Sequence, residues 1–192
     1  MTEPRGYHHG DLRTALILIA RELVRESGPD GWSMREASRR AGVSQAAPYR
    51  HFEDKTALLD AVGAGVYAEL EARYREVIDS GDAKASALAV AQAYLHYAFD
   101  EPRLFRLIFS SPKLHETAEA VHSYRVFEQA IRSAQEHGAL PAGSTAMLAH
   151  VIWCGVHGVA DLVLSGSLGR RHGTKVAKRL LAALFCGLRE NS

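Results

Sequence analysis

The sequence has little of what would assign it to several common protein classes. It contains two cysteines and six prolines in 192 residues, and its formal net charge is only +1. Cys154 and Cys186 both lie in apolar runs, so the chain has neither a disulfide framework nor a zinc-ribbon spacing. A near-neutral chain gives no general electrostatic reason to bind nucleic acid. An argument for DNA binding must therefore rest on a motif and its geometry.

Catalytic and membrane signatures are also missing. The sequence has no H-E-x-x-H, P-loop, dinucleotide fingerprint or G-x-S-x-G elbow, which leaves a metal-dependent helical enzyme as a remote alternative. The N-terminus, MTEPRGYHHGDL, lacks the apolar core of a signal peptide. His150, His157 and Asp161 interrupt the apolar stretch 145–164, where they would be costly in lipid. We expect a cytoplasmic protein with no cofactor and no membrane partner.

The scarcity of proline fits a helical pattern along nearly the whole chain. Leu12, Leu16, Ile19 and Leu23 recur every three or four residues and predict an amphipathic helix, which Gly28-Pro29 ends. Asp54 is expected to cap a helix that ends at 80–81. Further helices are predicted at about 82–99, 102–110, 113–137, 144–165 and 174–189, and no alternation of period two indicates a strand. The predicted fold is all-α, with three N-terminal helices at 1–60 and a larger helical unit at 61–192.

The segment 33–52, SMREASRRAGVSQAAPYRHF, predicts two short helices joined by a tight turn. Ser33 and Glu36 form a capping box at the start of the first helix. Gly42 lies where such a turn requires a positive φ. Ser44 is the expected N-cap of the second helix, predicted from Gln45 to about His51, and this second helix would enter the major groove.

The second helix carries side chains that suit DNA. Gln45 can pair with adenine, and an alanine can contact a thymine methyl group. Tyr49, His51 and Lys55 can donate to backbone phosphates. From Gly31 to Lys55 there are five Lys/Arg against three Asp/Glu, a weak local excess of positive charge. Because similar helix pairs occur in proteins that never bind DNA, the pattern alone leaves both interpretations open.

Several motifs in the first 60 residues resemble the TetR/AcrR family of regulators. They are Tyr7–Arg13, Gly28–Gly31, Arg35-Glu36, Ala41–Ser44 and Ala47–Lys55. The resemblance implies a three-helix helix-turn-helix DNA-binding domain at 1–60, a helical ligand-binding and dimerisation domain at 61–192, and repression relieved by a small-molecule effector. Together with the helix chemistry it gives these candidate DNA contacts: Ser33, Arg35, Ser44, Gln45, Ala46, Ala47, Tyr49, Arg50, His51 and Lys55. One departure is that Ala46-Ala47-Pro48 leaves few side chains able to read bases.

The last two long helices indicate a homodimer. The predicted helix 144–165 is apolar nearly all round and must be buried on more than one side. The helix 174–189 repeats this pattern, so we expect a two-fold four-helix interface, with burial inside one chain as the alternative. The run Trp153–Ala160 resembles a subgroup of the same family marked by a Trp…His-Gly signature.

A polar stripe and several aromatic residues are candidates for a ligand site. His150, Cys154, His157 and Asp161 share one face of the helix, which allows a metal site, a polar seam in which Asp161 fixes the tautomer of His157, or chance placement. The candidate pocket residues are Tyr94, Phe105, Phe109, Tyr124, Phe127, Trp153 and His157. Aromatic residues at helical spacing are also ordinary core residues. A DNA-binding regulator without an inducer therefore remains the main alternative function.

Overall fold

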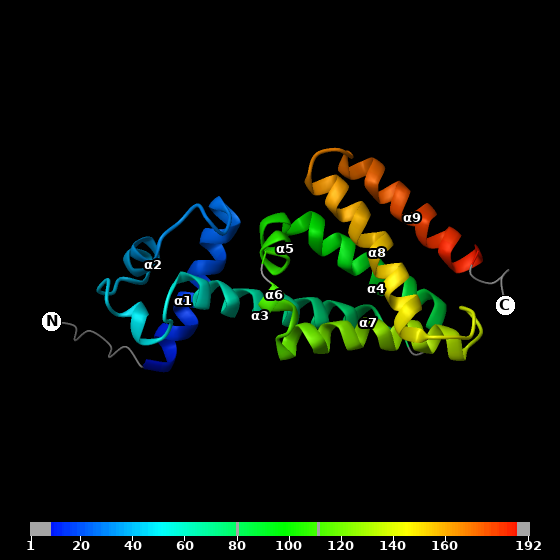
Figure 1. Cartoon of the computed structure of the whole chain (residues 1–192), viewed down its shortest axis with the longest axis horizontal. Helices are drawn as coiled ribbons and strands as arrows, with labels where there is room; N and C mark the ends of the chain where they lie inside the picture. Colours follow the sequence, from blue (N-terminus) through cyan, green and yellow to red (C-terminus); the bar gives the residue numbers. More distant parts are fainter. Residues whose placement is uncertain (1–8, 80, 111, 188–192) are drawn as a thin grey trace. The chain divides into compact units, whose positions relative to one another are not determined.

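The structure is a computed structural model, and it describes residues 9–79, 81–110 and 112–187 (Figure 1). These residues form helices joined by short turns, and none of them forms a strand, so the predicted all-α fold is confirmed. The helices are α1 (His9–Ser27), α2 (Met34–Ala41), η1 (Pro48–Arg50), α3 (Lys55–Val77), α4 (Ala83–Asp100), α5 (Pro102–Ile108), α6 (Pro112–His115), α7 (Ala118–Glu136), α8 (Thr145–Leu164) and α9 (Arg170–Gly187).

The described chain divides into two compact units, and α3 contributes to both. The first unit holds the described residues up to Val66 together with Arg103–His115. The second holds Tyr67–Pro102 and the described residues from Glu116 onwards. The expected boundary at 60–61 falls inside α3, and the segment 103–115 joins the N-terminal unit rather than the C-terminal one.

In the first unit, α1 packs against α2. The apolar stripe of α1 is buried, including Leu16 and Val24 at 0% exposure. Gly28 ends the helix as the sequence predicts, with φ +80° and its N–H donating to the carbonyl of Val24 at 2.8 Å. Gly63 of α3 allows a close approach, because an added Cβ would lie 2.6 Å from the Leu114 side chain of α6.

The second unit packs α4 against both α7 and α8, and α8 against α9. Because α4 contacts helices on two sides, its buried residues cover most of its circumference, among them Ala87, Val90, Leu95 and Ala98. Small alanines let the neighbouring helix axes come close. The core of this unit therefore surrounds α4, the helix that carries Tyr94.

Several of the predicted helix boundaries are wrong. The stretch predicted as one helix at 113–137 is two, because the Thr117 hydroxyl accepts from the N–H of Ala120 at 3.2 Å and caps a new helix, α7. The last helix begins at Arg170, before Gly173 instead of after it. Within α9, Gly173 lies so close to α8 that an added Cβ would meet Val163 at 2.3 Å. The helix predicted to end at 80–81 ends instead at Val77, and residues 78–79 are not helical. The predicted end at 189 lies outside the described residues.

Candidate nucleic-acid and ligand sites

The turn after α2 has the local geometry that the sequence predicts. The Ser33 hydroxyl accepts from the N–H of Glu36 at 3.3 Å, which caps α2. Gly42 adopts φ +68°, and its N–H donates to the carbonyl of Arg39 at 3.2 Å. Ala37 is fully buried at the centre of α2. The glycine therefore reverses the chain direction where a helix-turn-helix requires it.

The predicted recognition helix from Gln45 to His51 is wrong. Residues 45–47 form turns, and only Pro48–Arg50 form one turn of 3-10 helix. Pro48 has no N–H to donate to the carbonyl of Ser44, and that carbonyl instead accepts from Ala47 at 3.1 Å. The segment tightens into bonds between residues three apart, so Ser44 does not cap an α-helix.

The candidate DNA-contacting side chains lie mainly on the outside of this segment. Arg35, Ser44, Gln45, Ala46 and Arg50 are exposed, as is Ser33, whereas Ala47, His51 and Lys55 are half-buried. Tyr49 is 55% exposed, which is high for a large aromatic side chain. Pro48 is buried beneath the segment and Phe52 is 4% exposed.

Lys55 has a partner that sequence reasoning missed. Its Nζ donates to the backbone carbonyl of Trp32 at 2.6 Å and lies 4.6 Å from the centroid of the Trp32 ring. Trp32 is 7% exposed and directly precedes the cap of α2. Asp54 caps α3 as predicted, accepting from the N–H of Ala57 at 2.8 Å. The start of α3 is therefore tied to the start of α2 through Lys55.

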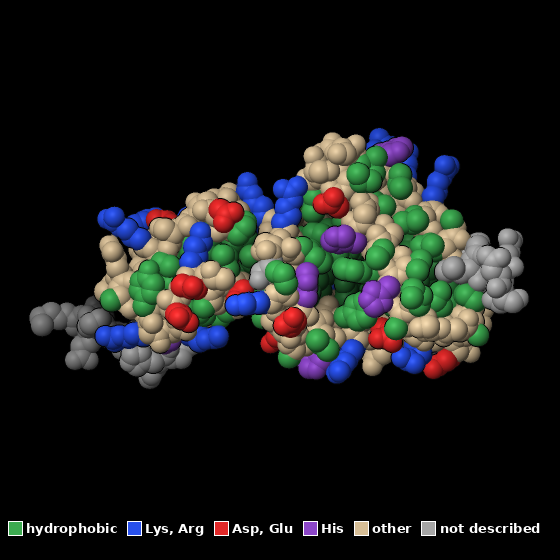
Figure 2. All heavy atoms as spheres, in the orientation of Figure 1, with side chains coloured by type: hydrophobic (Ala, Val, Ile, Leu, Met, Phe, Trp, Pro, Cys, Tyr) green, Lys and Arg blue, Asp and Glu red, His purple; other side chains and the backbone are tan. Residues whose placement is uncertain are grey.

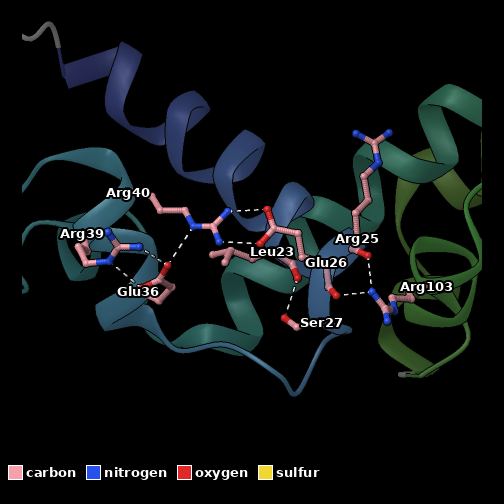
Figure 3. Close-up of polar contacts among 8 residues, drawn as sticks. All are labelled: Leu23, Arg25, Glu26, Ser27, Glu36, Arg39, Arg40 and Arg103. Carbon is pink, nitrogen blue, oxygen red and sulfur yellow. Dashed lines mark hydrogen bonds and ion pairs between the residues drawn. The ribbon is translucent and has the colours of Figure 1, made fainter.

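Two arginines of α2, Arg39 and Arg40, belong to an ion-pair network (Figure 3). Arg40 bridges the carboxylates of Glu26 and Glu36, at 2.6 and 3.0 Å, and Arg39 binds Glu36 at 2.7 Å. Hydrogen bonds from Arg39 and Arg40 lower the pKa of Glu36 to about 2. Arg35 and Arg50 form no ion pair within the described part of the chain and are the arginines left to face an anion.

The C-terminal end of α1 is also held by α5. The Arg103 guanidinium donates to the carbonyl of Arg25 at 2.6 Å and to the carbonyl of Glu26 (Figure 3). A cation at this position satisfies carbonyls that have no partner within the helix. Because Arg103 lies far from α1 in sequence, local patterning gave no signal for this contact.

In the second unit, buried Tyr94 and half-buried His157 form a polar pair. The Tyr94 Oη of α4 lies 2.6 Å from the His157 Nδ1 of α8, and Tyr94 is 3% exposed. Burial holds the pKa of Tyr94 well above its usual value. The Trp153 ring lies 5.4 Å from the His157 ring, centroid to centroid. The expectation that Asp161 orients His157 is wrong, because Asp161 is exposed and Tyr94 takes this role.

A second pair, Tyr124 and His150, lies in the same unit. Their Oη and Nδ1 atoms are 3.0 Å apart, and the Tyr124 ring stacks beside Phe127 at 6.4 Å. Phe127 also contacts Tyr74 of α3 edge-on at 6.1 Å. Burial raises the pKa of Tyr74, which sequence reasoning missed as a candidate. On the side of the second unit that faces the viewer, Figure 2 shows histidine side chains beside a hollow with hydrophobic walls.

The predicted pocket set is divided between the two units. Tyr94, Tyr124, Phe127, Trp153 and His157 belong to the second unit, but Phe105 and Phe109 belong to the first. The centroid of the Phe109 ring lies 5.0 Å from the centroid of the Phe105 ring and 5.4 Å from that of the His115 ring. As for the metal alternative, no three His, Cys, Asp or Glu side chains in the described residues are placed to hold an ion.

One face of α8 exposes large apolar side chains. Met147 is 64% exposed, Val151 37% and Leu162 48%. Among the described helices, α8 is the one long and apolar enough to cross a membrane by length and composition. The core helix of a soluble protein passes the same test, so this finding alone is weak support for a membrane span. On α9, Leu181 is only 1% exposed and packs within the chain.

Two family models match the chain in succession. One, described as bacterial regulatory proteins of the tetR family, matches residues 16–62. The other, described as a tetracyclin repressor-like C-terminal domain, matches residues 87–185, just over half of the chain. The two matches cover most of α1 to the start of α3, and then α4 to α9.

Curated relatives match parts of the chain. The HTH-type transcriptional repressor KstR2 of Rhodococcus jostii is 27% identical over 112 residues, which is 58% of this chain and 55% of that protein. The tetracycline repressor protein class A of Escherichia coli is 44% identical over 54 residues, or 28% of this chain and 25% of that repressor. The chain thus aligns with about half or less of the length of these relatives.

Solved structures match nearly the whole chain. A protein of unknown function from Rhodococcus sp. RHA1 is 30% identical with a TM-score of 0.82, covering 96% of this chain and 99% of that one. A TetR-family transcriptional regulator from Pectobacterium atrosepticum has a TM-score of 0.72 at 24% identity, covering 95% and 94% of the two chains. At that identity the second similarity shows the fold alone.

Proposed function

This chain belongs to the TetR family and is a DNA-binding transcriptional regulator rather than an enzyme, and we propose that it is a ligand-responsive repressor. In this proposal a homodimer binds a palindromic operator in the cytoplasm and releases it when a small molecule binds the second unit. The two curated relatives described above are both named as repressors, which supports repression over activation.

The observation that carries the proposal is the exposed segment 45–50, which we call the recognition segment. Gln45, Tyr49 and Arg50 point outwards from a tight turn whose inner side is fixed by buried Pro48 and Phe52. A backbone that is already held in place adds little ordering cost when its side chains contact a groove. We assign Gln45 to a base edge, and Tyr49 and Arg50 to base or phosphate contacts.

Lys55 keeps its proposed phosphate role alongside its contact with Trp32. An ammonium group has three donors, and the Trp32 carbonyl uses one of them. The remaining donors can reach a phosphate without breaking the contact that ties α3 to the cap of α2. Such contacts position a protein on duplex DNA without reading its sequence.

The exposed apolar face of α8 supports a homodimer. Met147, Val151 and Leu162 would be costly to leave in water over one continuous helix face. A second copy related by two-fold symmetry would cover this face with the same face of its own α8. Half-buried Leu180 and Leu184 on α9 extend the apolar surface, while fully buried Leu181 does not contribute to it.

The effector site that we propose lies at the Tyr94–His157 pair. A hydroxyl and an imidazole among apolar walls can orient a mostly apolar molecule that carries a polar group. Release of the operator would follow if the molecule binds more tightly to a dimer that does not fit the operator. Linkage then requires that operator DNA weaken ligand binding by the same factor.

The test starts with an operator selected from random duplexes and a compound found by its effect on thermal unfolding. We expect that compound to weaken operator binding, and the operator to weaken compound binding by an equal factor. A compound that binds equally well with and without operator would contradict the inducer role and favour a regulator without an inducer. Gln45→Ala should weaken operator binding, with the exposed Gln129→Ala on α7 as the matched control.

A further inference from the structure

A strip of positive charge follows the exposed side of α9. Arg171, Lys175, Lys178 and Arg179 are spaced to lie on one side of the helix, and all four are exposed. None of them forms an ion pair within the described part of the chain, whereas the neighbouring Arg170 binds Asp100 at 2.6 Å. Figure 2 shows Lys and Arg side chains projecting where α9 lies in Figure 1. We name these four residues the α9 basic strip.

A small cavity opens beside the strip, between α4 and α9. It has a volume of about 130 Å³ and is lined by Gln92, Leu95, His96, Phe99, Thr174, Ala177 and Lys178. Leu95, Phe99 and Ala177 are buried and form an apolar floor. Lys178 belongs both to the cavity lining and to the basic strip. An apolar hole and a row of cations are therefore continuous with each other.

The size and charge of this surface select its occupant. Pockets for small molecules usually measure roughly 300–1,000 Å³, so this cavity suits a single apolar side chain instead. Arg171 and Arg179 are about 12 Å apart along the helix, at a rise of roughly 1.5 Å per residue. A strip of that length exceeds what one carboxylate can engage. The occupant must therefore carry several negative charges and one apolar group.

We propose that the α4–α9 cavity and the basic strip form a docking site for an acidic segment of another protein, with one apolar side chain in the cavity. The apolar centre and charged rim are the usual anatomy of a protein interface. Duplex DNA matches the charge, but its thymine methyl groups lie inside the major groove, whereas this cavity needs an apolar group that projects outwards. Residues 1–8 and 188–192 each contain one acidic residue, so neither stretch has the several negative charges that this occupant needs.

The docking site is separate from the two sites proposed above. On α9, Val176, Leu180 and Leu184 fall on a different side of the helix from the basic strip, so a dimer formed through them leaves the strip exposed. Tyr94 is buried and His157 is half-buried, whereas Lys175 and Lys178 are exposed. Partner binding at this surface would give the regulator an input that needs no small molecule.

The test uses the full chain and a fluorescent peptide of about twelve residues in which glutamates flank one leucine. We expect saturable binding that weakens as salt increases. Lys175→Glu combined with Lys178→Glu should weaken it by at least about tenfold. Lys84→Glu with Arg125→Glu makes the same charge change at exposed sites elsewhere in the second unit and should leave binding nearly unchanged.

Two altered peptides separate the contributions of charge and apolar anchor. Replacing the leucine by serine should weaken binding by about tenfold, since a buried leucine contributes on that order. Replacing the glutamates by glutamines should abolish binding. Circular dichroism checks that each variant keeps its helix content. Equal binding of the leucine and serine peptides, or no binding of the leucine peptide, would overturn the proposal. The proposal would also be overturned if an unrelated DNA duplex displaced the peptide and both double variants lost peptide binding to the same extent.

Discussion

The two units present their candidate site residues in opposite ways. In the first unit, Gln45 and Arg50 are exposed on a turn, and buried neighbours hold that turn in place. In the second unit, Tyr94 is itself buried and bonded to His157. In the first unit the residues proposed for function are not those that stabilise the fold, whereas in the second unit the same residues do both. Mutations should therefore change DNA affinity without unfolding the protein, but should change ligand response and stability together.

The largest effect should come from the support of the recognition segment. Phe52 is 4% exposed, and the Arg13 guanidinium lies 5.2 Å from its ring centroid. Phe52→Ala should lower the free energy of unfolding by about 3–5 kcal/mol, through lost burial and a cavity. Urea unfolding measures the change, and Leu18→Ala, at a side chain 59% exposed, is the control with little expected change. A loss below about 1 kcal/mol would show that Phe52 does not support the segment.

The outer side of the same segment should behave in the opposite way. Gln45→Ala should cost about 1–3 kcal/mol of discrimination at one operator base pair, because a bidentate contact to adenine is lost. The free energy of unfolding should change by less than about 0.5 kcal/mol, since the side chain is exposed. Binding to every single-base variant of the operator gives the readout. An equal loss at all positions would contradict base reading by Gln45.

In the second unit, Tyr94→Phe should reduce stability and ligand response together. Removing the hydroxyl leaves the His157 Nδ1 without its partner from α4, at a cost of about 1–3 kcal/mol. Tyr124→Phe removes a longer bond, 3.0 Å to the more exposed His150, and should cost less. Thermal unfolding of the two variants gives the comparison. If Tyr94→Phe is as stable as the native chain, the pair does not contribute to this core.

These outcomes bear on how far the sequence predicts the molecule. The cap at Ser33, the turn at Gly42 and the cap at Asp54 are correct because each depends on residues a few positions apart. The recognition helix is wrong because Pro48 lacks the donor that the helical pattern assumes. Side-chain spacing describes which face a residue takes but not whether the backbone can complete its hydrogen bonds.

Contacts between distant segments were beyond local patterning. Tyr94 and His157 are 63 residues apart, and Asp161 was the nearer partner by helical spacing. Likewise, Lys55 was expected only at DNA, but its Nζ also binds a carbonyl 23 residues away. The sequence identified the chemical character of these residues. Their partners depend on how the helices pack.

Lys55 tests whether one residue in the first unit can serve both structure and DNA binding. Lys55→Met should lower the free energy of unfolding by about 1 kcal/mol, because the Trp32 carbonyl and ring lose a cation. It should also lower the slope of operator affinity against salt by about one unit. Exposed Lys84→Met is the control for both measurements. A reduced stability with an unchanged salt slope would leave Lys55 with the structural role alone.

The smallest effect concerns the ion pairs of the first unit at low pH. Bonds from Arg39 and Arg40 lower the pKa of Glu36 to about 2 from an ordinary 4.5. A lowered carboxyl pKa stabilises the folded state above the ordinary value, and this contribution is lost as pH falls towards 2. The stability difference between the native chain and Glu36→Gln should therefore shrink between about pH 5 and pH 2. Exposed Glu53→Gln makes the same chemical change outside the ion-pair network and is the control.

The central claim, a dimer that reads DNA through the exposed segment, is tested most directly by the composition of the operator complex. Duplexes selected from a random pool are bound by the purified protein, and sedimentation gives the number of chains per duplex. We expect two chains on an inverted repeat whose half-sites are about 34 Å apart, or a near multiple. One chain per duplex, or a selected pool with no inverted repeat, would contradict it.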